Sequence, residues 1–142
     1  MMKNSPENIE DRRRQRSEDP ELAIGYQLER VVEDFNLECC LIVDESGTTI
    51  ATSPDSPTPL MQRFAAMLPT MATVTEHRDE HLKQLREVRS DLGDDDLTAC
   101  VFRAGGRRLF IGAVGPEAVM NEMAIFRAIT GARRIHGSDD DQ

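Results

Sequence analysis

The sequence predicts a mixed α/β domain in which three helical segments alternate with two β-hairpins. Two apolar, β-prone runs carry this prediction: residues 37–53 (LECCLIVDESGTTIATS) and residues 97–115 (LTACVFRAGGRRLFIGAVG). A glycine turn breaks each run, at Gly47 in the first and at Gly105 and Gly106 in the second, which is typical of a hairpin. Helix-like sequence precedes, separates and follows the two runs, so the element order is helix, hairpin, helix, hairpin, helix.

Length and composition indicate one folded domain between two polar ends. The chain has 142 residues and a net charge of −9. We expect residues 1–18 to form a disordered tail and residues 137–142 (GSDDDQ) a disordered acidic tail. Residues 19–136 are enough for one hydrophobic core. In the first tail, residues 12–16 (RRRQR) form either a solvated segment or a docking peptide for an acidic partner.

Charge and cysteine usage exclude several function classes. A net negative charge disfavours binding to nucleic acid or to an anionic membrane surface. The sequence has no apolar run of about 18 residues and no signal-peptide pattern. Its three cysteines include an adjacent pair, which does not match a secreted disulfide framework, so we expect a cytoplasmic protein.

The first helix and first hairpin have clear patterns. Asp19 and Pro20 predict the start of the helix, which should end near Asn36. Its apolar face follows 4-3-4 spacing and consists of Ile24, Leu28, Val31 and Phe35. The first strand of the hairpin is apolar on both faces and is predicted to be central, whereas the second has Ile50 as its one large apolar residue and is predicted to be an edge strand.

The middle of the chain is harder to assign. After a proline-rich loop, apolar residues predict a short amphipathic helix that Pro69 should bend or stop. Residues 72–92 allow two interpretations, because Leu82, Leu85, Val88 and Leu92 have near-helical spacing. The alternative is a strand over residues 85–92, joined to the next strand by the acidic turn 93–96. We favour the strand, since GDDD is a good hairpin link.

The second hairpin alternates regularly and is predicted to lie in the interior of the sheet. A last helix should start at residues 115–117 and end at Gly137. Its spacing predicts a buried stripe consisting of Val119, Met123, Phe126, Ile129 and Thr130.

Motifs that would carry chemistry are weak. Residues 77–81 (HRDEH) match the H-x-x-E-H pattern of some zinc proteases, but the segment is polar and has no apolar frame for a metal site. Cys39 and Cys40 should point to opposite faces of a strand, which favours core packing over shared metal binding. We therefore predict no catalytic, metal-binding or cofactor-binding residues, and no cofactor.

The two hairpins resemble a known family. LIVDESGTTIATS, and FRAGGRRLFIGAVG followed by an amphipathic helix, are similar to the first and last hairpins of the roadblock/dynein-light-chain family, over roughly residues 20–135. The resemblance implies a three-layer α/β/α fold, roadblock/profilin-like, with a five-stranded antiparallel sheet. The first and last helices would cover one face and the middle helix the other. It also implies homodimerisation through the middle helix and the following strand.

Bacterial members of that family often regulate Ras-like small GTPases, as activators or scaffolds, without catalytic residues of their own. We therefore predict a non-enzymatic, dimeric regulator or adaptor that acts on or with a Ras-like small GTPase or another signalling protein. A methionine-rich apolar surface suits adaptable protein contacts. The candidate interface residues are Leu60, Phe64, Met67, Leu68, Met71, Leu85 and Val88.

Two other functions stay open. One is a sensor or scaffold domain of the PAS, GAF or profilin-like kind, binding a small molecule or a protein partner. The other is a hydrolase that would use His77, Glu80 and His81.

Overall fold

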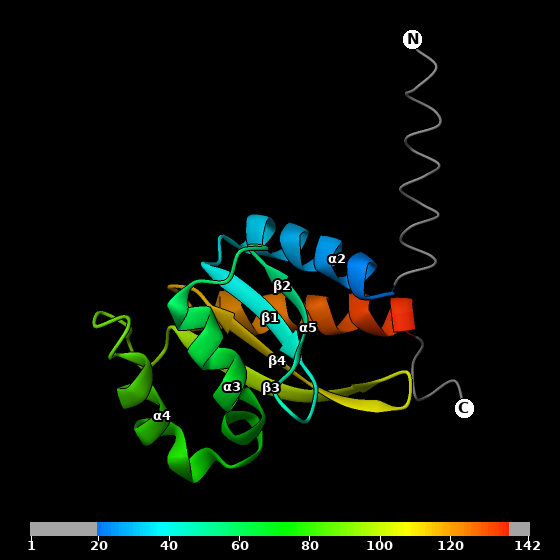
Figure 1. Cartoon of the computed structure of the whole chain (residues 1–142). Coiled ribbons are helices and arrows are strands. Elements are labelled where there is room, and N and C mark those ends of the chain that lie inside the picture. Colours follow the sequence, from blue (N-terminus) through cyan, green and yellow to red (C-terminus); the bar gives the residue numbers. More distant parts are fainter. Residues whose placement is uncertain (1–19, 137–142) are drawn as a thin grey trace.

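The computed structural model describes residues 20–136, which fold as an antiparallel sheet between helices (Figure 1). The predicted tails, with residues 12–16, lie outside the described residues. In chain order the elements are α2 (Pro20–Phe35), β1 (Cys39–Val43), β2 (Thr49–Ser53), α3 (Pro59–Thr73), the 3₁₀ turn η1 (Thr75–His77), α4 (Arg78–Leu85), β3 (Leu97–Ala104), β4 (Arg107–Val114) and α5 (Ala118–His136). Among the described residues, the structure contains no helix long and apolar enough to cross a membrane.

The sheet has the strand order β2-β1-β4-β3, and every neighbouring pair is antiparallel. Strand β1 is central and buried along its whole length, and β2 is an edge strand, so the prediction for the first hairpin is confirmed. The second hairpin is interior only at β4. Strand β3 forms the other edge of the sheet that residues 20–136 build.

Helices cover both faces of the sheet, in the predicted three layers. Helices α2 and α5 cover one face, whereas α3 and α4 lie on the other (Figure 1). Strand β1 supplies both cores, because alternate side chains of a strand point to opposite faces. Cys40 and Ile42 pack towards α2 and α5, whereas Cys39, Leu41 and Val43 pack towards α3 and α4.

The sheet has four strands, not five, because the predicted strand at residues 85–92 does not form. Helix α4 ends at Leu85 and residues 86–92 form turns and loop. Leu82 and Leu85 are buried in the core between the sheet and α3. Arginines hold this segment to the loop before β3. Arg78 Nη2 donates to the carbonyls of Asp94 and Leu97, each at 2.7 Å, and Arg86 Nε donates to that of Leu92 at 2.7 Å.

Pro69 does not end α3, which continues to Thr73. A proline at this position removes the hydrogen bond to the carbonyl four residues earlier, that of Ala65. Gly47, at φ +86°, brings the β1–β2 turn onto this part of the helix. A β-carbon at Gly47 would lie 3.6 Å from the Ala65 carbonyl oxygen. The turn therefore covers the helix backbone where the proline interrupts its hydrogen bonding.

The predicted buried stripe of α5 is wrong, because the helix packs with its other face. Mostly small residues face the sheet and α2: Ala124, Ala128 and Ala132 are completely buried, and Ile125 is 4% exposed. Ile129 is half-buried and Thr130 is exposed. The larger Val119, Met123 and Phe126 are 69%, 52% and 75% exposed. Small side chains allow a closer approach between packed elements, so α5 lies against its neighbours on its alanine face.

Candidate interaction surfaces

Helix α3 has most of the predicted interface residues, and the structure places them in the domain core. Five of the seven are buried, namely Leu60, Phe64, Leu68, Met71 and Leu85. The Phe64 ring lies directly on the sheet, since a β-carbon at Gly112 of β4 would come within 2.4 Å of it. Met67 is half-buried and Val88 is exposed, so these two retain surface that a second chain could contact.

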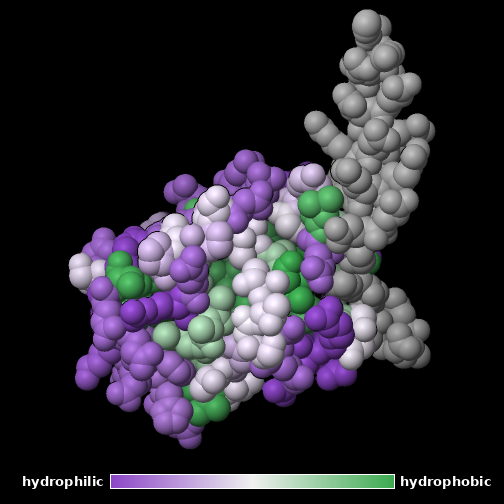
Figure 2. Space-filling view, viewed as in Figure 1, coloured by the Kyte–Doolittle hydropathy of each residue, from purple (hydrophilic) through white to green (hydrophobic). Residues whose placement is uncertain are grey.

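The outward face of α3 is made of small and polar residues. Gln62, Ala66 and Thr70 are exposed along it. Figure 2 shows neutral to weakly hydrophobic residues over α3, bordered by hydrophilic residues over α4. Arg63 links α3 to α4 and the turn after it. Its Nη1 donates to Glu87 Oε1 at 2.8 Å and to the Gln84 carbonyl at 3.2 Å.

The edge strand β3 is a second surface of interest, and sequence reasoning did not identify it as an edge. Each residue of β3, from Leu97 to Ala104, pairs with β4. Edge strands present backbone N–H and C=O groups on their outer side, which can pair with another strand. Val101 is 39% exposed on this strand. The helical spacing of Leu82 and Leu85 could have revealed this edge. A helix at these residues leaves no fifth strand to pair with the outer side of β3.

The loop between α4 and β3 is anchored to the centre of the sheet by Arg89. Its guanidinium forms ion pairs with Glu38, just before β1, and with Asp91 at 2.7 Å. These hydrogen bonds raise the pKa of Arg89 above its usual value. The segment that departs most from the predicted topology is thus tied to the first strand.

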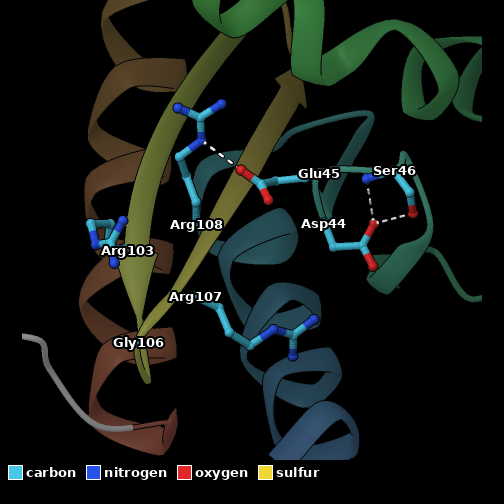
Figure 3. A pocket seen from close by; sticks show the side chains of 7 residues that line it. All are labelled: Asp44, Glu45, Ser46, Arg103, Gly106, Arg107 and Arg108. Atoms are coloured by element: carbon cyan, nitrogen blue, oxygen red, sulfur yellow. Dashed lines mark hydrogen bonds and ion pairs between the residues drawn. The ribbon is translucent and has the colours of Figure 1, made fainter.

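The tips of the two hairpins line a polar pocket of about 690 Å³ that is open to solvent (Figure 3). Arg103, Arg107 and Arg108 come from the β3–β4 hairpin, opposite Asp44 and Glu45 of the β1–β2 turn. Both acids already have partners within the chain. Glu45 Oε2 lies 3.1 Å from Arg108 Nε.

Asp44 closes its own turn. Its Oδ1 accepts hydrogen bonds from the Ser46 hydroxyl at 2.7 Å and from the backbone N–H groups of Ser46 and Thr48. These bonds, with the Ser46 hydroxyl foremost, lower the pKa of Asp44. The carboxylate therefore stays charged and hydrogen-bonded within the turn. This favours a structural role in the turn over a role as general acid or base.

The histidines and cysteines do not gather into a metal-binding group in the described part of the chain. The rings of His77 and His81 are 6.4 Å apart and edge-on, and burial lowers the pKa of His81. Within residues 20–136, no three His, Cys, Asp or Glu side chains are placed to hold one metal ion.

Cys39 and Cys40 lie in opposite cores, as their adjacency on a strand predicts. Burial raises the pKa of Cys39 to about 12 and also raises that of Cys40. Since the thiolate is the reactive form, burial and the raised pKa values disfavour reaction of these two thiols at neutral pH.

The outer face of α5 is the surface that sequence reasoning misplaced. Val119, Met123 and Phe126, with Phe35 of α2, line a groove of about 430 Å³ that also includes Glu122 and Arg127. The 4-3 spacing of the apolar residues was visible in the sequence, but spacing alone does not say which face of a helix meets the sheet.

Comparison with known proteins identifies the fold. No family model matches the chain, and no curated protein matches its sequence. A solved structure of Myxococcus xanthus MglB superimposes with a TM-score of 0.53, covering 83% of this chain and 90% of that one, at 12% sequence identity. The fold is that of a roadblock domain. The resemblance seen in the two hairpins is thus confirmed at the level of the fold, with four strands in the sheet.

Proposed function

We propose that this chain is a roadblock-type regulator or adaptor that acts as a homodimer with a Ras-like small GTPase. The observation that carries the proposal is the fold shared with MglB, a GTPase regulator, over most of both chains. Sequence identity is low, so the proposal concerns the class of partner and not a particular GTPase.

We propose that the dimer forms through the edge of β3 and the neighbouring outer face of α3. The exposed edge can continue the sheet into a second copy by backbone hydrogen bonding. The small Ala66 on the outer face of α3 leaves room for close approach of another helix. Met67 and Val88 are the predicted interface residues that keep accessible surface, whereas a change at Phe64 would test the core.

We propose that the chain is not itself an enzyme. The turn acids Asp44 and Glu45 are engaged within the chain, and the thiols of Cys39 and Cys40 are buried with raised pKa values. The hairpin-tip pocket is open and polar, unlike the enclosed apolar sites that usually hold small molecules, so the sensor alternative has less support.

A binding and turnover assay tests the GTPase proposal. The full chain is mixed with candidate small GTPases loaded with GDP or with a GTP analogue, and both affinity and the rate of GTP hydrolysis are measured. We expect tighter binding to one nucleotide state. Equal absence of binding to both states, for every candidate, contradicts the proposal.

Sedimentation equilibrium tests the dimer. Val101→Lys places a charge on the exposed edge of β3, where lysine commonly blocks strand pairing. We expect a dimer for the unaltered chain and a monomer for this variant, with Phe126→Ala as a control that stays dimeric. A monomeric unaltered chain contradicts the dimer, and a dimeric Val101→Lys variant moves the interface away from β3.

A further inference from the structure

Helix α5 has two apolar faces, and the domain uses only one of them. The inner face is rich in alanine and is buried against α2 and the sheet. The outer face consists of Val119, Met123 and Phe126, which recur at i, i+4 and i+7. A helix at the surface of a domain normally turns polar residues outward, so an outward row of large apolar side chains calls for a covering partner.

The outer row has the geometry of a helix-docking seam. The 4-3 spacing continues to Thr130, which gives the narrow apolar stripe by which one helix packs along another. The Phe126 ring is 75% exposed, more than any other large apolar side chain in residues 21–135. The groove between α5 and the end of α2 adds Phe35 to the row. Its volume, about 430 Å³, is enough for large side chains of a partner helix.

The groove is braced by the domain itself. Arg127 Nη1 forms an ion pair with Asp34 Oδ2 at 2.8 Å, and its guanidinium stacks over the Phe35 ring at 5.6 Å. Gln27 Nε2 donates to the Arg127 carbonyl at 3.5 Å. These contacts hold one wall of the groove in place before any partner binds, which lowers the ordering cost of association.

The charges beside the seam favour an acidic partner. Among the described residues, the charges beside the groove are Glu122 and Arg127 of α5 and Asp34 of α2, whereas Arg133 and Arg134 lie at the C-terminal end of the apolar row. Arg127 is already balanced by Asp34, so the local excess comes from Arg133 and Arg134, both exposed. Within the described part of the chain this end of α5 is basic, although the whole chain has a net charge of −9. Complementary charge across an interface gives specificity and speeds association.

We propose that the outer face of α5 docks an amphipathic helix of a partner protein, with acidic residues beside its apolar row. A second copy of this chain fits the charges less well. Parallel, in-register pairing of two α5 helices would set Arg133, which follows Thr130 at the next position of the 4-3 row, against Arg133 of the other copy. Antiparallel pairing would bring the same flank of both helices together, with Arg127 facing Arg127. The surface is on the opposite side of the sheet from α3, so it is separate from the dimer proposed above.

Two synthetic peptides of three heptads test this surface. They share one leucine row and differ only in their flanking positions, which are all Glu in one and all Lys in the other. Like charges at these positions also keep each peptide from pairing with itself. Fluorescence anisotropy with the full chain measures the affinity for each peptide. We expect the Glu peptide to bind about tenfold or more tightly than the Lys peptide.

Variants locate the binding on α5. Phe126→Ala and Met123→Ala remove apolar surface without adding charge, and each should weaken binding of the Glu peptide about tenfold. The double variant Arg133→Glu with Arg134→Glu should reverse the preference towards the Lys peptide. Gln84→Glu, on the opposite layer, is a matched control and should leave binding unchanged. Thermal unfolding confirms that each variant is folded, as the exposure of these side chains predicts.

Three results would overturn the proposal. The first is equal or tighter binding of the Lys peptide to the unaltered chain. The second is a Glu-peptide affinity that Phe126→Ala leaves unchanged. The third is a different occupant, seen as Phe126-dependent self-association in sedimentation or Phe126-dependent binding to vesicles of phosphatidylserine and phosphatidylcholine. Because none of these measurements uses a GTPase, their failure is distinguishable from failure of the proposed function.

Discussion

Helices α3 and α5 cover opposite faces of one sheet, yet they use their large apolar residues in opposite ways. Helix α3 buries Phe64 and Leu68 against the sheet and leaves small and polar residues outside. Helix α5 buries three alanines and Ile125, and leaves the larger row of Val119, Met123 and Phe126 outside. Both have an apolar row at helical spacing, so the comparison shows that a row predicts a contact surface without saying whether the contact is internal.

The largest expected effect separates the two phenylalanines. Phe64→Ala removes a completely buried ring and should lower the free energy of unfolding by about 3–5 kcal/mol. Phe126→Ala removes a ring that is mostly in water and should change it by less than about 0.5 kcal/mol. Urea unfolding of both variants at neutral pH measures the difference. Equal losses would mean that the outer face of α5 is covered within the folded chain.

A second comparison uses Gly112 of β4, which lies under α3, and Gly131 within α5. Gly112→Ala places a β-carbon 2.4 Å from the buried Phe64 ring and should cost about 1–3 kcal/mol of unfolding free energy. Gly131→Ala, in α5, meets the flexible side chain of Gln27 at 2.6 Å. Alanine also favours the helix by about 1 kcal/mol over glycine, so the net change should be near zero. A Gly131→Ala loss as large as that of Gly112→Ala would show that α5 packs as rigidly as α3.

The smallest effect concerns the turn that covers α3. Hydrogen bonds lower the pKa of Asp44 in the folded chain, so its charged form stabilises the fold. This contribution is complete above the unfolded pKa of about 3.9 and is lost as the pH falls through the lower folded pKa. Asp44→Ala should therefore be less stable than the unaltered chain at pH 7 and converge with it in acid. A gap that persists unchanged at pH 3 in urea unfolding contradicts this role.

The two hairpins were predictable because their patterns are local. The central position of β1 follows from a run that is apolar on both faces, and the edge position of β2 follows from its lone large residue, Ile50. Glycine turns at Gly47 and at Gly105 and Gly106 have positive φ angles, which glycine adopts most readily. Such patterns depend on a few neighbouring residues, so the tertiary structure does not alter the hairpins that they predict.

The strand predicted over residues 85–92 was wrong because the signals in this part of the chain compete. Leu82 and Leu85 fit a helix, whereas the acidic run at residues 93–96 fits a hairpin turn. The outcome depends on Arg78 and Arg86, whose long side chains reach carbonyls 16, 19 and 6 residues further along the chain. Bonds across such separations leave no periodic pattern in the sequence.

The candidate surfaces divide in the same way. Chain order, local turns and the apolar rows of α2, α3 and α5 were all readable from residue spacing. The edge at β3, the burial of the α3 row and the exposure of the α5 row arise only when the elements pack. Which face of a helix is buried depends on how the whole face fits its neighbours. On α5 the alanine-rich face is buried because small side chains let the helix approach the sheet and α2 closely. Spacing reports that an apolar face exists, whereas shape and volume select which face is buried.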